Sequence, residues 1–168
     1  MSNIIVVGLA RHGKDTVSAM IADKLGLTFQ SSSMVLLDEV IYPVLKDKYG
    51  YKDEHECFED RVNHRQEWFE LLRDYNTPDA TRLGRLIFSR HKIYCGLRNT
   101  NELEALVLAG LVDYIVWVDA VDRLGVTESE SITIWPDEAN YIINNNGDLA
   151  DLEAEVNDFC AMIKGHTL

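Results

Sequence analysis

Short apolar runs alternate along the chain with longer segments in which apolar residues recur at helical spacing. The first run, residues 3–7 (Asn-Ile-Ile-Val-Val), is continuously apolar after its first residue. A parallel strand buried on both faces has this pattern. The next segment predicts a helix that ends at Gly26, because its apolar residues fall on one stripe: Val17, Met20, Ile21 and Leu25.

The same alternation continues to the end of the chain. Further strands are predicted at 27–30, 93–97, 114–118 and 141–143. Helices are predicted at 34–49 with a bend at Pro43, at 60–75, from Pro78, at 101–109 and from about Asp148. Residues 50–60 and 120–134 are expected to be loops. Strands that alternate with helices imply an α/β fold in which about five parallel strands form a sheet covered by helices on both faces.

Length and composition place the chain among ordinary folded proteins. It has 168 residues, of which 46% are hydrophobic and 26% charged, so we expect one domain spanning 1–168. No stretch reaches the roughly 20 apolar residues of a membrane span, and the first residues lack the basic region of a signal peptide. Cys57, Cys95 and Cys160 lie far apart. They suggest neither a disulfide framework nor a metal site, and a cytoplasmic location is expected.

The charge is strongly negative but unevenly distributed. A net charge of −12 argues against nucleic acid as a partner, since a phosphate backbone needs a basic face. Residues 61–98 nevertheless hold eight Lys and Arg against four Asp and Glu. These cations are either ordinary helix surface charge or part of a pocket for a small anion such as a phosphate.

One motif carries specific chemistry. The stretch from Gly8 to Thr16, Gly-Leu-Ala-Arg-His-Gly-Lys-Asp-Thr, fits the phosphate-binding pattern G-x-x-x-x-G-K between a buried strand and an amphipathic helix. Backbone N–H groups and the positive end of the helix form an anion cradle in such loops, and the lysine reaches the β- and γ-phosphates. The sequence therefore predicts that a nucleoside triphosphate binds to Ala10, Arg11, His12, Gly13, Lys14, Asp15 and Thr16.

Two positions in the loop have alternative interpretations. The residue after the lysine, which often binds Mg²⁺ through a hydroxyl, is Asp15, and Thr16 stands one place later. Either residue is a candidate ligand, while Asp15 also suits a helix N-terminus by its charge alone. His12 either contacts a phosphate or is an exposed loop histidine.

Four ordered motifs together resemble the bacteriophage deoxynucleoside monophosphate kinases, a family of P-loop kinases. They are Arg-His-Gly-Lys-Asp-Thr at 11–16; Gly-Leu-Arg-Asn at 96–99 with Glu102; Trp-Val-Asp at 117–119 with Arg123 and Ser-Glu at 129–130; and Ile-Asn-Asn-Asn-Gly at 143–147 with Leu149 and Leu152. The resemblance spans nearly the whole chain. This sequence departs from the family at 95–96, where it has Cys-Gly and the family often has an acidic residue. Asp15 or Asp119 would then have to supply the carboxylate that binds the metal or the substrate.

The resemblance and the sheet geometry suggest roles for residues outside the loop. Arg98 is expected at the carboxyl edge of a strand, where it would clamp the acceptor phosphate or the transferring group. Arg123 would act from a lid at 120–134. For both arginines the alternative is a surface ion pair.

The acceptor is expected to bind in the helical region 34–90. Arg61 and Arg65, spaced i and i+4, would hold its phosphate and Trp68 its base, unless the arginines are solvated and Trp68 is core. Asn145 would contact the donor adenine, as the family's corresponding loop does, although a turn before a helix explains it almost as well.

The implied reaction is ATP-dependent, Mg²⁺-dependent phosphorylation of a (deoxy)nucleoside monophosphate to the diphosphate. Two alternatives stay open: a kinase for a modified nucleotide or another small phosphorylated metabolite, and a nucleotide-binding regulator without turnover. The expected partners are small molecules rather than nucleic acid or membrane. A homodimer is left open, and the location would be the host cytoplasm if the source is viral.

Overall fold

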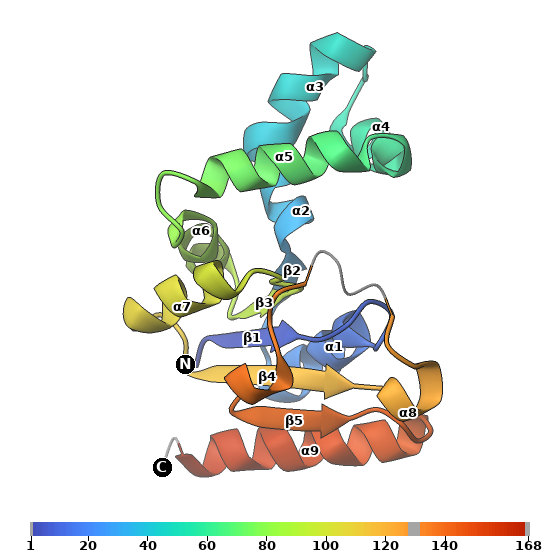
Figure 1. The fold of residues 1–168 in the computed structure, drawn as a ribbon, viewed down its shortest axis with the longest axis vertical. Helices are drawn as coiled ribbons and strands as arrows, with labels where there is room; N and C mark the ends of the chain where they lie inside the picture. Colours follow the sequence, from blue (N-terminus) through green and yellow to red (C-terminus); the bar gives the residue numbers. More distant parts are fainter. Residues whose placement is uncertain (1, 128–131, 167–168) are drawn as a thin grey trace.

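The computed structural model describes residues 2–127 and 132–166, whose five strands form one parallel sheet (Figure 1). The strands are β1 (Ile4–Val7), β2 (Phe29–Ser31), β3 (Ile93–Cys95), β4 (Tyr114–Asp119) and β5 (Tyr141–Asn144). Their order across the sheet is β2-β3-β1-β4-β5, with every pairing parallel. The predicted α/β class and strand number are confirmed.

Helices cover both faces of the sheet, as the continuously apolar strands require. Ile4 and Val6 of β1 belong to an apolar cluster with residues of α1 (Lys14–Leu25) and α9 (Leu149–His166). Ile5 and Val7 belong to a second cluster, built from α2 (Ser32–Leu36), α6 (Arg82–Arg90) and α7 (Thr100–Leu108). Because successive side chains of a strand point to opposite faces, β1 contributes to both clusters and lies at the centre of three layers.

A helical arm rises from the edge of the sheet at the end of the molecule away from α9 (Figure 1). It contains the π-helical turn η1 (Leu37–Ile41), α3 (Tyr42–Tyr49), α4 (Glu54–Glu59), the 3₁₀ turn η2 (Asp60–Asn63) and α5 (Arg65–Asn76). The predicted helix 34–49 changes character at η1 rather than at Pro43. Pro43 falls in the first turn of α3, where a missing N–H is tolerated.

The prediction of a loop at 50–60 was wrong for most of that stretch, because α4 forms there. The side chain of Asp53 accepts a hydrogen bond from the Glu56 backbone N–H at 2.8 Å and so caps the helix. Glu54 and Glu56 in the first turn favour the positive end of the helix dipole, and Cys57 is buried. The acidic composition that suggested a loop is the signature of a helix start.

The predicted loop 120–134 contains the short helix α8 (Val121–Leu124), and a 3₁₀ turn, η3 (Pro136–Glu138), follows it. Ile132 and Ile134 are buried in the apolar cluster beneath α7, which fixes the returning chain against the sheet. The Ser-Glu pair at 129–130 lies outside the described residues. None of the helices in the part of the chain that the structure describes is long and apolar enough to span a membrane.

Candidate nucleotide-binding site

The glycine-lysine loop leaves β1 at the carboxyl edge of the sheet, between the ends of two neighbouring strands. Val6 pairs with Cys95 of β3, and Val7 pairs with Trp117 of β4. From β1 the chain continues to β2 and β3 on one side of β1, and from β3 it crosses to β4 on the other side. The loop after β1 therefore lies at the point where successive strands are added in the opposite direction. Ligands of open parallel sheets bind at this point.

Two glycines of the loop are held against other segments so closely that a side chain would not fit. A Cβ on Gly8 would lie 2.7 Å from the Val118 carbonyl oxygen. A Cβ on Gly13 would lie 2.6 Å from Asn145 Nδ2, and Gly13 has a φ of +100°. Arg11, at the tip of the loop, also has a left-handed backbone with a φ of 64°. The loop is therefore wound tightly against β4 and the segment after β5.

The start of α1 adds backbone N–H groups at this loop. Gly13 is the N-cap and supplies no side-chain cap, and the first turn of the helix, which carries the positive end of the helix dipole, begins with Lys14, Asp15 and Thr16. Lys14 Nζ donates to the carbonyl oxygens of Gly8 at 2.9 Å and Leu9 at 3.0 Å. Together these groups form a cationic cradle suited to phosphate oxygens.

The imidazole of His12 anchors the loop. The residue is fully buried. Its Nδ1 accepts a hydrogen bond from the Ala120 backbone N–H at 3.1 Å, and its Nε2 donates to the Gly125 carbonyl oxygen at 3.0 Å. These partners define the neutral tautomer with the proton on Nε2. The ring links the loop to both ends of α8, and a phosphate contact by His12 stays a prediction that would require these bonds to break.

Asn145 is also turned toward the loop. It is buried, its Nδ2 donates to the His12 carbonyl oxygen at 2.9 Å, and its backbone N–H donates to the Asp119 carbonyl oxygen at 2.7 Å. The contact of Asn145 with adenine stays a prediction. In this arrangement its amide braces the loop.

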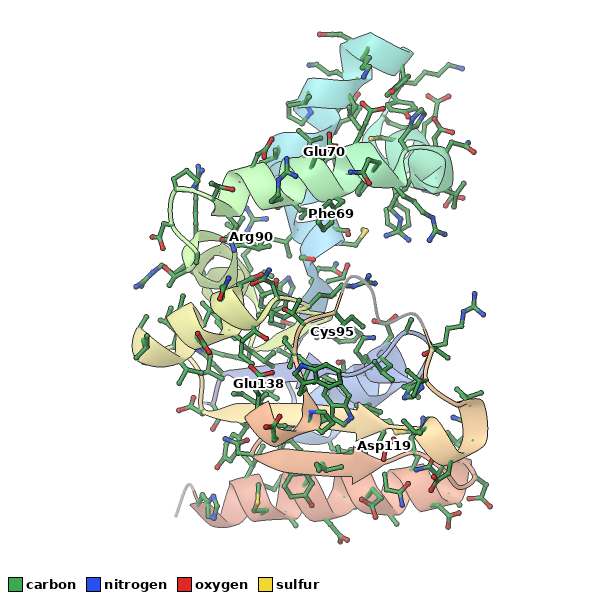
Figure 2. All side chains as sticks on the ribbon, viewed as in Figure 1. Phe69, Glu70, Arg90, Cys95, Asp119 and Glu138 are labelled. Carbon is green, nitrogen blue, oxygen red and sulfur yellow. The ribbon has the colours of Figure 1, made fainter. Side chains whose placement is uncertain are left out.

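Asp15 is connected to β3. The Cys95 Sγ donates a hydrogen bond to Asp15 Oδ1 at 3.3 Å, and burial raises the pKa of the Cys95 thiol to about 12, which keeps it a neutral donor. The other candidate carboxylate, Asp119 at the end of β4, uses its Oδ1 to accept from the Val121 backbone N–H at 2.9 Å (Figure 2). Of these two carboxylates, only that of Asp15 belongs to α1, the helix that directly follows the loop.

The donor set at the loop fits a magnesium ion that is held mainly by a bound nucleotide. Among the described residues no group of three or more His, Cys, Asp or Glu side chains converges as an all-protein cage would. Mg²⁺ is usually held by one or two carboxylates, phosphate oxygens and water. Asp15 and Thr16, both exposed in the first turn of α1, are hard oxygen donors of this kind.

The two predicted catalytic arginines flank the loop on opposite sides. Arg98 follows β3 and is exposed, and its carbonyl oxygen accepts a hydrogen bond from the Thr133 backbone N–H at 2.9 Å. Arg123 lies in α8 on the β4 side. Its Nε donates to the Asn145 carbonyl oxygen at 3.1 Å, and its backbone N–H donates to Asn146 Oδ1 at 3.2 Å.

Residues 120–127, the first part of the predicted lid, are bonded to the phosphate-binding loop. Besides the His12 bond to Gly125, the hydroxyl of Thr127 donates to the Ala10 carbonyl oxygen. Any movement of 120–127 as a lid would therefore have to break these bonds.

The predicted acceptor residues separate on the helical arm. Trp68 is 2% exposed and lies in the apolar cluster, with the Arg61 guanidinium 5.8 Å from its ring centre and 4.6 Å from that of Phe58. This burial weighs against a base contact by Trp68, because no open face of the ring remains. Arg65 is exposed on the same helix.

Sequence reasoning overlooked Phe69, which is 52% exposed. Figure 2 shows it on the side of α5 turned toward the sheet, whereas Glu70 lies on the opposite side. Phe69 follows Arg65 by four residues, so the two share a helix face. That spacing was a signal in the sequence, but it was outweighed by the neighbouring, larger Trp68.

A further contact that the sequence did not predict joins β3 to Glu102 of α7. The Tyr94 hydroxyl donates to Glu102 Oε1 at 2.8 Å, and Tyr94 is buried. Burial raises the pKa of the Glu102 carboxyl to about 7, while the hydrogen bond from Tyr94 acts in the other direction. Glu102 thus titrates near neutrality at the base of the helix that follows Arg98.

Comparison with known proteins gives structural neighbours but no sequence relatives. No family model and no curated protein sequence matches the chain. Among solved structures, a gluconokinase from Sinorhizobium meliloti 1021 aligns over 99% of this chain and 98% of its own, with 16% identity and a TM-score of 0.49. A shikimate kinase from Aquifex aeolicus aligns over 98% of both chains, with 14% identity and a TM-score of 0.48.

A third neighbour is a sugar kinase from Janibacter sp. HTCC2649. It aligns over 98% of this chain and 95% of its own, with 13% identity and a TM-score of 0.49. At these values the neighbours carry no weight about the chemistry of this chain. The resemblance to the bacteriophage deoxynucleoside monophosphate kinases stays a prediction from motifs.

Proposed function

We propose that this protein is a phosphotransferase that moves the γ-phosphoryl group of ATP to a (deoxy)nucleoside monophosphate, releasing ADP and the diphosphate. The observation that supports this most directly is the cradle at the switch point of the sheet. There the N-terminus of α1 and the Lys14 ammonium lie at one loop. That combination of a helix N-terminus and a lysine suits the polyphosphate of a nucleotide.

On the donor side, each loop residue has a distinct task. The backbone N–H groups of Lys14, Asp15 and Thr16 would bind phosphate oxygens. Lys14 now donates to two backbone carbonyls and would exchange them for the β- and γ-phosphates, following the charge as it moves. His12 and Asn145 would keep the loop in shape while this happens, because both are buried and bonded to it.

The acceptor would bind to exposed side chains beyond the carboxyl edge of the sheet. Arg98, exposed beyond β3, would bind the acceptor phosphate or the transferring group. Figure 2 shows Phe69 on the side of α5 turned toward the sheet. Arg65 is exposed and precedes Phe69 by four residues, so the two share a helix face, and a cation next to an exposed ring suits a phosphate attached to a base. Phe69 takes the place that the sequence suggested for Trp68.

In the reaction, an oxygen of the acceptor phosphate forms a bond to the γ-phosphorus as the bond from that phosphorus to the bridging oxygen of ADP breaks. Mg²⁺ bound with the nucleotide supplies neutralising charge on the phosphates. The protein contributes positioning and fixed positive charge, which carry most of the catalysis in phosphoryl transfer. Arg123 is proposed to act from the β4 side of the loop.

A coupled assay of ADP release tests the proposal. ATP and Mg²⁺ are supplied with each ribo- and deoxyribonucleoside monophosphate in turn. We expect turnover with one or a few of them, and Lys14→Ala to lower kcat/KM by about 100-fold or more because a preorganised charge is lost. Lys24→Ala is the matched control, since Lys24 lies at the other end of α1 and contacts Glu153 at 3.5 Å.

The assay also separates the alternatives. Turnover only with other phosphorylated metabolites would keep the kinase and replace its acceptor. ATP binding without turnover on any acceptor would contradict the kinase proposal and favour a nucleotide-binding regulator, for which Cys95-Gly96 in place of an acidic residue is the supporting feature.

A further inference from the structure

The end of β3 places a thiol beside the glycine-lysine loop. Cys95 is the last residue of β3 and pairs with Val6 of β1. It is 2% exposed, so its side chain is directed into the structure. A thiol can donate a weak hydrogen bond.

The acceptor of that hydrogen bond is Asp15. The Cys95 Sγ lies 3.3 Å from Asp15 Oδ1, although the two residues are 80 positions apart in the chain. A sulfur–oxygen distance of this length is an ordinary weak hydrogen bond. Asp15 itself is exposed and lies in the first turn of α1, beside the backbone groups that would bind phosphate. The thiol therefore holds one oxygen of this carboxylate.

Asp119, the other carboxylate at this edge, has a different task. Its Oδ1 accepts from the Val121 backbone N–H at 2.9 Å, and its own carbonyl oxygen accepts from the Asn145 N–H at 2.7 Å. Both bonds organise α8 and the segment after β5. Asp119 is thus engaged on the β4 side of the loop, and Asp15 is the carboxylate oriented from the β3 side.

We propose that Cys95 is a positioning residue that orients Asp15 toward the magnesium ion of the bound nucleotide. The pair would replace an acidic residue at the end of β3. Asp15 of α1 would supply the carboxylate, and Cys95 of β3 would set its orientation. This inference rests on the proposed nucleotide-binding function. A neutral partner suits the arrangement, because a second carboxylate 3.3 Å away would repel Asp15.

The test measures metal binding rather than turnover. Mn²⁺ replaces Mg²⁺ as the probe, and its affinity for the protein–ADP complex is followed by electron paramagnetic resonance. We expect Cys95→Ala to weaken Mn²⁺ binding about 10-fold, the lower end of the range for loss of a group that orients a metal ligand. Cys95→Ser should restore the affinity to within about threefold, since its hydroxyl can donate the same bond.

Two controls distinguish positioning from packing. Cys160→Ala removes another buried thiol, in α9, and should leave Mn²⁺ affinity unchanged. ADP affinity measured in EDTA should be the same in wild type and Cys95→Ala, because the proposed role requires the ion. Thermal melting confirms that each variant is folded.

The outcomes discriminate clearly. Wild-type Mn²⁺ affinity in Cys95→Ala would overturn the inference, as would a loss of metal-free ADP affinity that matches the loss with metal. Metal-dependent ADP binding that behaves as expected, without turnover on any acceptor, would support the role of Cys95 and reject the kinase proposal. A wild-type protein that binds no ADP in either condition would overturn both.

Discussion

Gly13 and Asn145 depend on each other at the tightest point of the site. Asn145 Nδ2 donates to the His12 carbonyl oxygen at 2.9 Å, and the same nitrogen lies 2.6 Å from where a Cβ of residue 13 would stand. A side chain at this position would displace the amide that braces the loop. The φ of +100° adds a backbone conformation that other residues rarely adopt.

Gly13→Ala should therefore lose both stability and nucleotide affinity. We expect the free energy of unfolding to fall by roughly 2–4 kcal/mol, combining backbone strain with the clash at Asn145. Gly50→Ala is the matched control, because Gly50 has a φ of +70° with nothing within 4 Å of its Cβ position. It should cost about 1 kcal/mol and leave nucleotide binding intact.

Urea unfolding and the binding of a fluorescent ATP analogue measure the two effects for both variants. Equal losses of stability in the two variants, with nucleotide affinity retained in both, would show that the contact with Asn145 does not constrain the loop.

At the scale of elements, Tyr94 and Glu102 join a buried strand to the helix that follows it. The Tyr94 hydroxyl donates to Glu102 Oε1 at 2.8 Å. Burial raises the pKa of Glu102 from 4.5 in the reference state to about 7 in the folded protein. The unfolded chain therefore loses this proton at lower pH than the folded chain does. Between the two values the folded state binds more protons, and its stability falls as the pH rises.

Glu102→Gln should remove this pH dependence. The stability contributed by the protonated form is fully present below pH 4.5 and is lost as the pH rises through about 7. The difference amounts to roughly 3 kcal/mol at most, from the size of the pKa change. Glutamine keeps an oxygen that can accept from the Tyr94 hydroxyl. At pH 8 the free energy of unfolding of Glu102→Gln should therefore exceed that of wild type by up to roughly 3 kcal/mol.

Urea unfolding at pH 5, 6, 7 and 8 measures this gain. Glu104→Gln, exposed on the same helix, is the control and should follow the wild-type profile. Parallel pH profiles for wild type and Glu102→Gln would contradict the buried-carboxyl interpretation.

At the scale of the whole molecule, two apolar clusters on opposite faces hold the sheet, and α9 closes one of them. Phe159 of α9 is fully buried, and its ring centre lies 4.8 Å from that of Tyr141 and 5.8 Å from that of Tyr114. These tyrosines belong to β5 and β4, so one side chain ties the last helix to two strands. The strands that carry the site depend on this packing.

Phe159→Ala should lower the free energy of unfolding by about 3–5 kcal/mol, as expected for a fully buried phenylalanine. Leu149→Ala, at the exposed start of the same helix, should change it by less than about 0.5 kcal/mol. Thermal and urea unfolding measure both. A loss below about 1 kcal/mol for Phe159→Ala would mean that α9 contributes little to the stability of the sheet.

The sequence by itself determined the succession of strands and helices along the chain, the parallel sheet and the position of the glycine-lysine loop. These features follow from local properties. A strand buried on both faces needs a run such as Ile4–Val7, and a helix against the sheet needs a stripe at 3.6-residue spacing. The spacing of glycine and lysine in residues 8–14 likewise predicts the type of loop from a short stretch of sequence. The existence of most helices and strands was therefore within reach. Two helices were missed, α4, whose Asp53 cap was overlooked, and α8, and the helix predicted from residue 60 begins only at Arg65.

Only the tertiary structure decided which side chains face the site. Periodicity along one helix does not tell which of two neighbouring aromatics is buried. The structure buries Trp68, which was the alternative to a base contact, and leaves Phe69 52% exposed. His12 became an anchor because Ala120, 108 positions away, arrives beside it. Asp15 gained its thiol partner because the strand order sets β3 next to β1. Contacts between residues so far apart depend on how the sheet is wound, which no local pattern in the chain encodes.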